Sequence, residues 1–188
     1  RIVEDVLQDG LQRGRVGEYP HAVGRTELED LRRQVVSAPD VRWLRCDLKT
    51  TSLLANCLLR QLAIDAGCVE TILFRDGCLT EGAASSIFAM KNGVLLAPPK
   101  THLMLPGITY DVVLELAEKH GLPCAVRDVL EGEARAADEL WMTSSTREVL
   151  PITSLDGQPI GTGQPGPVFR KMYAWYQDFK QTVMRAGE

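Results

Sequence analysis

The sequence predicts a mixed fold of the α+β or mixed α/β class, in which short strands form an antiparallel or barrel-like sheet flanked by helices. Apolar runs of strand length alternate with helical segments, but without a strict β-α-β rhythm. The dipeptides Asp76-Gly77, Asn92-Gly93 and Asp156-Gly157 are typical of tight hairpin turns. The chain has 188 residues, of which 45% are hydrophobic and 24% charged. These values are those of a globular chain with one domain, or one domain plus a fragment of another.

The composition changes near residue 40, where Ala38-Pro39-Asp40 reads as a boundary. Residues 1–40 are rich in arginine and glutamate, and we interpret them as a lead-in or as the remnant of a smaller N-terminal domain. Within them we expect one amphipathic helix over residues 26–36, with Thr26 as its N-cap and Glu29 completing a capping box. The chain begins with arginine, so we expect that a preceding segment is missing. The main domain is predicted over residues 41–188.

The periodicity after residue 40 predicts short strands and three helices. In chain order, the expected elements are a strand over 41–49 (VRWLRCDLK), a helix from the Thr50-Thr51-Ser52 hydroxyls to Gly67, the hairpins ETILF/CLT and SSIFAM/VLLAP, a helix from Thr109 to His120, the strands ELWMTSS and VLPITSL, and a helix from Val168 to Met184. The last helix carries an apolar stripe at helical spacing, which predicts packing on the core or on a subunit partner.

Composition and motif content exclude several functional classes. The net charge is −4 with no sustained basic stretch, which argues against a nucleic-acid partner. No apolar run is long enough to span a bilayer, which argues against a membrane partner. The five cysteines are scattered with no CxxC pair, which favours reduced thiols in the cytoplasm over disulfides or a metal site. No phosphate-binding P-loop is present, and the GxGxxG spacing from Gly161 to Gly166 does not directly follow a predicted strand.

Two side chains are candidates for chemistry. Lys49 stands where the predicted strand passes into a helix, and its amine would become a nucleophile if its pKa were lowered. Periodicity alone favours a solvent-facing lysine, because lysines are mostly exposed. Glu81 lies in LTEGAASSIF, where small residues follow it, so its carboxylate could pair with a protonated ring nitrogen of a ligand. The alternative is a glutamate in a hairpin turn.

Two segments are candidates for anion binding. Leu105-Pro106-Gly107-Ile108-Thr109 enters a helix, and the amides of Ile108 and Thr109 would be free donors at its positive end. Four hydroxyls, Thr143-Ser144-Ser145-Thr146, follow an apolar strand and could add phosphate contacts. Helix capping and turn formation explain each segment equally well.

Four motifs together carry a resemblance to a known family. They are DVRWLRCDLKTTSLLAN, VETILFRDGCLTEGAASSIF, MLPGITYDVV and DELWMTSSTREVLPI. In this order they resemble the large domain of the fold-type IV pyridoxal-phosphate enzymes, in the branched-chain aminotransferase superfamily, and most of all the D-amino-acid transaminases. The resemblance covers about residues 41–188. It implies pyridoxal 5'-phosphate as cofactor, Lys49 as the Schiff-base lysine that also moves a proton between Cα and the cofactor's C4′, and Glu81 as the partner of the ring nitrogen.

The resemblance also implies the remaining site residues and the reaction. Gly107, Ile108 and Thr109 would bind the cofactor phosphate at a helix N-terminus, with Ser144 and Ser145 adding contacts. The activity would be ping-pong transamination of D-amino acids with a 2-oxo acid acceptor, in a homodimer. In this family a smaller N-terminal domain contributes an arginine to the phosphate and an Arg-x-His pair to the substrate carboxylate, and residues 1–40 contain no matching pair.

Two smaller departures concern side chains near the cofactor. Ser145 replaces the family's usual threonine and keeps the hydroxyl, whereas Ser86 stands where asparagine is common. Two alternatives stay open. The chain could act as a branched-chain-type aminotransferase or an aminodeoxychorismate lyase, which share the fold and the lysine, or it could be an inactive, truncated remnant that only binds the cofactor.

Overall fold

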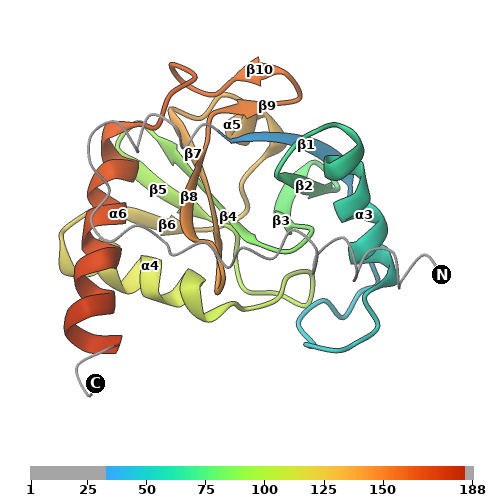
Figure 1. Cartoon of the computed structure of the whole chain (residues 1–188), viewed down its shortest axis with the longest axis horizontal. Helices are drawn as coiled ribbons and strands as arrows, with labels where there is room; N and C mark the ends of the chain where they lie inside the picture. Colours follow the sequence, from blue (N-terminus) through green and yellow to red (C-terminus); the bar gives the residue numbers. More distant parts are fainter. Residues whose placement is uncertain (1–32, 185–188) are drawn as a thin grey trace, which may run out of the picture.

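A computed structural model describes residues 33–184 of the chain (Figure 1). Its elements, in chain order, are β1 Gln34–Pro39, α3 Leu54–Asp65, β2 Glu70–Arg75, β3 Cys78–Gly82, β4 Ser86–Lys91, β5 Val94–Ala97, α4 Ile108–Lys119, β6 Cys124–Val126, α5 Glu131–Arg135, β7 Glu139–Ser144, β8 Glu148–Ile152, β9 Ser154–Leu155, β10 Gln158–Pro159, α6 Pro167–Phe179 and the π-helical segment η1 Lys180–Met184.

The strands form two five-stranded sheets, ordered β10-β9-β1-β2-β3 and β6-β5-β4-β7-β8. Each sheet mixes parallel and antiparallel pairs, because β1 runs parallel to β2 and β9, and β5 runs parallel to β6. Helix α3 lies beside the first sheet, whereas α4 and α6 lie together on the second, at the opposite end of the molecule in Figure 1. The predicted mixed fold is confirmed.

Three tight turns were predicted correctly. Asp76-Gly77 joins β2 to β3, Asn92-Gly93 joins β4 to β5, and Asp156-Gly157 joins β9 to β10. Both residues of each turn have positive φ, between 50° and 78°. This is the conformation that matches the twist of antiparallel strands, and aspartate, asparagine and glycine tolerate it best.

The helix predicted over residues 26–36 is wrong at its C-terminal end. Residues 34–36 belong to β1, the middle strand of the first sheet, while Thr26 and Glu29 lie outside the described residues. The β-branched pair Val35-Val36 favours a strand once neighbouring strands are present on both sides, and this tertiary pairing outweighs the local helical pattern. Part of the expected lead-in therefore contributes to the same sheet as residues after 40.

The strand predicted over residues 41–49 is also wrong. This segment is an irregular loop with a turn at Cys46-Asp47. Of the apolar residues that alternate in it, Leu44 and Leu48 are exposed and only Cys46 is buried, so no half-buried strand forms. The following helix begins at Leu54, later than predicted, and no side chain caps it. Thr50 Oγ1 instead accepts a hydrogen bond from the Ser52 amide at 2.9 Å, so these hydroxyls form a turn before the helix.

Two apolar clusters hold the sheets and helices together. The first packs the sheets on each other and includes Val35, Ile72 and Leu140. The second packs α4 and α6 on the second sheet, and Phe169 and Met172 of α6 are fully buried in it. The apolar stripe predicted for the C-terminal helix therefore packs on the chain's own core.

We expect Gly166→Ala to destabilise the fold by about 2 kcal/mol. Gly166 precedes α6, where the buried Glu139 carboxylate accepts hydrogen bonds from the Val168 and Phe169 amides at 2.9 and 2.7 Å. A Cβ on Gly166 would lie 2.0 Å from Glu139 Cδ, so this cap would have to move. Urea unfolding measures the loss. Gly132→Ala in α5 is the control, because a Cβ there has no neighbour within 4 Å, and equal midpoints for both variants would contradict the prediction.

Candidate functional site

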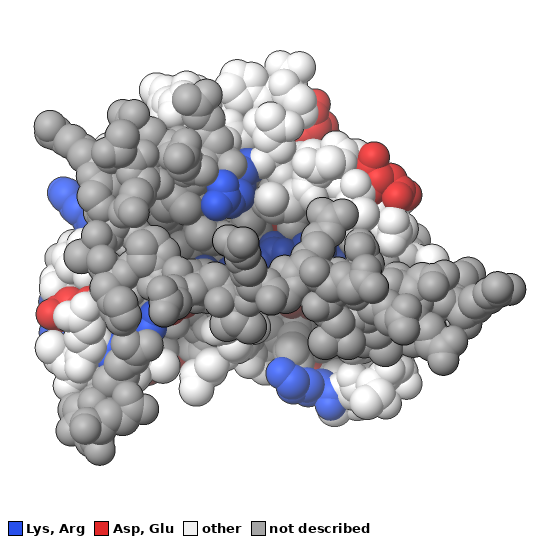
Figure 2. Space-filling view, in the orientation of Figure 1, with Lys and Arg blue, Asp and Glu red and all other residues white. Residues whose placement is uncertain are grey.

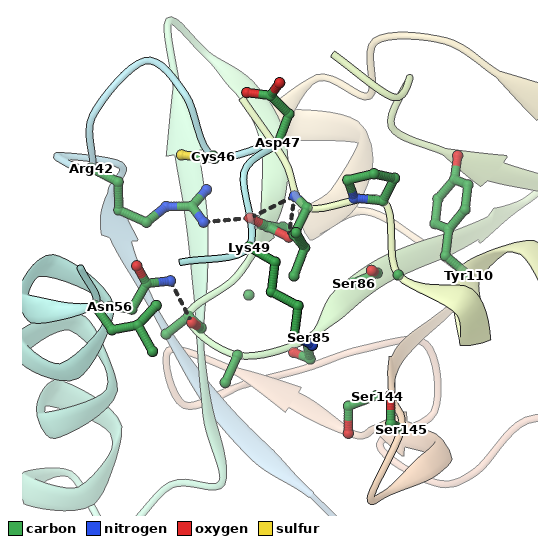
Figure 3. Close-up of a pocket in the computed structure, with 18 of the residues that line it drawn as sticks. Arg42, Cys46, Asp47, Lys49, Asn56, Ser85, Ser86, Tyr110, Ser144 and Ser145 are labelled. Atoms are coloured by element: carbon green, nitrogen blue, oxygen red, sulfur yellow. Dashed lines mark hydrogen bonds and ion pairs between the residues drawn. The ribbon is translucent and has the colours of Figure 1, made fainter. Parts of the chain in front are cut away.

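A cavity of about 830 Å³ lies between α3, the loop that carries Lys49, the β3–β4 connection, the N-terminus of α4 and the end of β7 (Figure 3). The structure brings every predicted site residue to its walls. These residues are Lys49, Glu81, Gly107, Ile108, Thr109, Ser144 and Ser145. Segments more than ninety residues apart in sequence thus line one space, which is the arrangement that a binding site requires.

Lys49 enters the cavity from the irregular loop rather than from a strand end. Figure 3 shows its side chain directed into the cavity, toward the side on which Ser85 lies. Backbone hydrogen bonds shape this loop, since the Cys46 amide donates to His102 O at 2.8 Å and the Leu48 amide donates to Arg45 O at 3.2 Å. The amine is therefore carried by a fixed loop and can reach a ligand in the cavity.

Glu81 lies in β3 and is only 5% exposed, so it is not a residue of the hairpin turn. Its two carboxylate oxygens both lie 3.2 Å from the Leu105 amide, and Oε1 also accepts a hydrogen bond from Arg42 Nη1. Burial raises the pKa of Glu81 to about 7, while Arg42 and the Leu105 amide act in the opposite direction. Near neutral pH the carboxylate can therefore take or release a proton.

Arg42 is a cavity residue that the sequence analysis missed. Its side chain is buried and paired with Asp40 as well as with Glu81. The sequence signal is an Asp-x-Arg spacing, which does not by itself indicate burial. Arg45 and Asp47 have the same spacing in reverse order, and they form a surface pair. Only the folded loop distinguishes the buried pair from the exposed one.

The N-terminus of α4 lies at the cavity wall. Gly107 is its N-cap in an extended conformation, and Ile108 and Thr109 are its first helical residues. The first amides of a helix have no intrahelical acceptor and carry the positive end of the helix dipole, so they suit an anion. Thr109 is buried, and its backbone amide belongs to this first helical turn.

Hydroxyl groups line the cavity beside the N-terminus of α4, where a Cβ on Gly107 would lie 3.6 Å from Ser86 Oγ. Ser86 of β4 pairs with Thr143 of β7, and Ser144 and Ser145 follow. Ser144 Oγ accepts a hydrogen bond from the Arg147 amide at 3.2 Å, so this hydroxyl also stabilises the turn that follows β7. Thr143 Oγ1 is buried and has no hydrogen-bond partner among residues 33–184. The sequence analysis noted Thr143 in the hydroxyl run but did not assign it to the site.

Other kinds of site find little support in the described part of the chain. Residues 33–184 contain no group of three or more potential metal-ligating side chains. No described helix is long and apolar enough to cross a membrane. Where described residues are visible in Figure 2, Lys and Arg lie in separate groups rather than on one continuous surface.

Sequence comparison connects this cavity to known proteins. Residues 18–155 match the family described as amino-transferase class IV. A D-alanine aminotransferase from Bacillus licheniformis is 44% identical over 143 residues, which cover 76% of this chain and 50% of that protein. A D-alanine aminotransferase from Listeria monocytogenes is 36% identical over 154 residues, covering 82% of this chain and 53% of that protein. The chain thus spans about half the length of these curated relatives.

Solved structures show the same architecture. The T.th. branched-chain amino acid aminotransferase, solved with pyridoxamine 5'-phosphate, superposes with a TM-score of 0.75 at 26% identity, covering 86% of this chain and 54% of that one. The branched-chain amino acid aminotransferase from Escherichia coli gives a TM-score of 0.66 at 29% identity, covering 76% and 50%. With the family match extending over most of its length, this chain belongs to the class IV aminotransferases.

Proposed function

We propose that this chain carries the cofactor site of a pyridoxal 5'-phosphate-dependent aminotransferase that acts on D-amino acids with a 2-oxo acid acceptor. One observation carries the proposal: a lysine, a buried carboxylate and a helix N-terminus line the same cavity in a member of this family. The cofactor has three groups that these residues complement, namely an aldehyde, a basic ring nitrogen and a phosphate.

The residues present fit this cofactor. The Lys49 amine suits the aldehyde, Glu81 suits a protonated ring nitrogen, and the Ile108 and Thr109 amides suit the phosphate. Ser144 and Ser145 add hydroxyl groups to the same wall, and the partnerless Thr143 Oγ1 is one more polar group beside them. The cavity is also large enough to hold a substrate beside the cofactor. A division into a lead-in and a cofactor domain remains part of this proposal, with β1 assigned to the cofactor domain because it pairs with β2 and β9.

The residues of the chain have distinct tasks in this reaction. When bound, the cofactor supplies an electron sink for the negative charge that develops at the substrate Cα. Lys49 would hold the cofactor covalently, and once the substrate's amino group had displaced it, the freed amine would move the proton between Cα and C4′. Glu81 supplies the negative charge that holds a proton on the ring nitrogen. The α4 amides hold the phosphate and so fix the ring's orientation relative to Lys49.

The preference for D-amino acids rests on the relatives. The sequence relatives reported above are named D-alanine aminotransferases, at 36 to 44% identity, whereas the structural neighbours are branched-chain enzymes at 26 to 29%. A branched-chain-type activity is therefore the second candidate, with an aminodeoxychorismate lyase as the related alternative. A remnant that binds cofactor without turnover is the third candidate.

Half-reactions separate these functions. We expect D-alanine, mixed with the cofactor-loaded protein, to be converted to its 2-oxo acid, with the amino group then passing to 2-oxoglutarate or pyruvate. L-Leucine and aminodeoxychorismate should leave the cofactor's absorption unchanged. Conversion of L-leucine but not D-alanine would replace this proposal by the branched-chain activity. Cofactor binding without any half-reaction would favour the inactive remnant.

We also propose a homodimer, with α3 at its interface. Leu54, Leu58 and Leu62 lie on one face of this helix at intervals of four residues, and they are 74, 61 and 46% exposed. The aromatic stripe of α6 was the expected contact surface, but it is buried in the chain's own core, so α3 is the better candidate. Sedimentation should show a dimer at micromolar concentration and a monomer for Leu58→Glu. A monomeric parent protein would contradict the proposal.

We propose a cytoplasmic location because the thiols are not paired in disulfides. All five cysteines are free, and Cys46 and Cys57 line the cavity. Reducing compartments keep such thiols unpaired.

A further inference from the structure

A chain of four charged side chains lies behind the cavity, between the loop after β1 and the strands β2 and β3. The order of contacts is Arg75, Asp40, Arg42 and Glu81. Positive and negative side chains alternate in this order, so their formal charges cancel. Arg42 is the central member, because its guanidinium contacts both carboxylates. Buried charges persist only where they are paired and hydrogen-bonded, so this group has to be treated as one unit.

Arg42 is locked in place independently of Glu81. Its Nε donates to Asp40 Oδ1 at 2.9 Å, and its Nη2 donates to Asp40 Oδ2 at 2.9 Å and to Leu103 O at 3.1 Å. Asp40 Oδ1 in turn forms an ion pair with Arg75 Nη2 at 3.1 Å, and Asp40 Oδ2 accepts a hydrogen bond from Thr80 Oγ1 at 2.9 Å. This two-pronged geometry requires the planar guanidinium, and a lysine amine cannot reproduce it.

The remaining nitrogen of Arg42, Nη1, determines which oxygen of Glu81 is left for a ligand. Arg42 Nη1 contacts Glu81 Oε1, whereas Oε2 has only the Leu105 amide, at 3.2 Å, among the described residues. Oε2 therefore keeps a lone pair for a ligand in the cavity.

We propose that Arg42 is a positioning residue, which orients Glu81 and keeps it ionised so that the proton shared with the cofactor stays on the ring nitrogen. This inference rests on the proposed function for its cofactor. Arg42 stabilises the carboxylate form of Glu81 by charge and hydrogen bonding, whereas burial alone favours the protonated acid. A protonated Glu81 would leave the ring nitrogen uncharged and would weaken the electron sink on which the reaction depends.

The charged and titratable groups around Glu81 determine the direction of this effect. Burial raises the pKa of Glu81, Arg42 lowers it, and Asp40 raises it further. Arg75 reaches Glu81 only through Asp40, and the neighbouring Cys46 has a thiol whose pKa is raised by burial. Lys49 lines the same cavity. Arg42 is the positive group in direct contact with the carboxylate, so its removal should raise the pKa of Glu81.

The first test uses the cofactor-free protein. Carbon-13 NMR of glutamate-labelled chain, with the Glu81 signal assigned by its loss in Glu81→Gln, follows the ionisation of this carboxylate. In Arg42→Gln we expect the midpoint to rise by one unit or more, which lowers the ratio of ionised to protonated Glu81 at a given pH by about tenfold. Arg45→Gln, which removes an exposed arginine from the same loop, is the matched control and should leave the midpoint unchanged.

Two further variants keep the test decisive. If Arg42→Gln does not fold because Asp40 is left short of a partner, the double variant Asp40→Asn, Arg42→Gln removes both charges. Its midpoint should rise in the same direction but by less, because Asp40 itself raises the pKa of Glu81. Arg42→Lys retains the charge but not the two-pronged geometry. We expect the Glu81 midpoint of Arg42→Lys to lie close to that of the parent, while its affinity for the cofactor falls several-fold. The two measurements separate the effect of charge from the effect of orientation.

The second test locates the proton in the loaded protein. With pyridoxal phosphate labelled with nitrogen-15 in the ring, the parent should give the shift of a protonated nitrogen, and Arg42→Gln that of an unprotonated one. An unchanged Glu81 midpoint in Arg42→Gln would overturn the proposal, as would a ring nitrogen that stays protonated. If the cofactor does not bind the parent at all, the proposed function fails, yet the cofactor-free titration still decides whether Arg42 controls the charge of Glu81.

Discussion

Alanine in place of Lys49 is expected to abolish covalent attachment of pyridoxal phosphate and to lower kcat by about 10⁴-fold. Lys49 is the lysine of the cavity wall, and the proposed mechanism uses its amine twice, as the nucleophile and as the carrier of the Cα proton. The measurements are the visible spectrum of the loaded protein and a steady-state transaminase assay. Circular dichroism before the assay shows that the variant is folded.

Lys171→Ala is the matched control for this change. Lys171 is exposed on α6 and does not line the cavity, so its loss should change neither the spectrum nor kcat. A small primary amine added to the Lys49→Ala protein should recover part of the lost rate, because it can carry the proton without being attached to the chain. A Lys49→Ala protein with unchanged kcat would show that another group performs the chemistry.

The second large effect concerns stability and pH. Glu81 has a pKa of about 7 in the folded protein against 4.5 as the ordinary value, so the native state binds a proton more tightly than the unfolded chain. This contribution to stability is fully present below pH 4.5 and is lost as the pH rises through 7. Between pH 4.5 and 8, the cofactor-free parent should therefore lose up to about 3 kcal/mol relative to Glu81→Gln.

Urea unfolding of both proteins at pH 5 and pH 8 measures this difference. Burial alone would raise the pKa of Asp40, but its contacts with Arg42 lower it. The contribution of Asp40 to stability is therefore lost only in more acidic solution, so it can be separated from the contribution of Glu81. Glu115→Gln, on the exposed side of α4, should follow the parent at both pH values. Parallel stability curves for the parent and Glu81→Gln would contradict the assigned role of burial at Glu81.

The elements that could be predicted from sequence are those whose signals are local. The Asp-Gly and Asn-Gly turns were found because two residues with positive φ have a strong composition signature. The helix α4 was found within one residue at each end, because Pro106-Gly107 precedes it and Gly121 follows it. In these places short-range preference and tertiary structure agree.

The elements that were missed depend on distant parts of the chain. Strand β1 exists because β2 and β9 pair with it on both sides, and β9 lies more than a hundred residues later. The loop before α3 resembles a strand because polar and apolar residues alternate in it, but its conformation depends on the contacts of Arg42 with Asp40 and Glu81. Neither contact is visible in a local pattern, and Glu81 is 39 residues away.

The candidate site shows the same division. Lys49, Glu81 and the α4 terminus were located through four short motifs, and the structure brings them to one cavity. Their individual roles stay predictions. Arg42 and the partnerless hydroxyl of Thr143 were not assigned, because burial and hydrogen-bond satisfaction are properties of the folded chain. An arginine in a charged loop gives no sequence signal that it supports a carboxylate.

The most direct test of this account is to identify the residue that holds the cofactor. The protein is incubated with pyridoxal phosphate, reduced with borohydride, digested and analysed by mass spectrometry. The account predicts a phosphopyridoxyl group on the peptide that contains Lys49, and none on that peptide in Lys49→Ala. Modification of a different lysine with Lys49 untouched would contradict it, and the assignments of Glu81, the α4 amides and Arg42 would then fail with it.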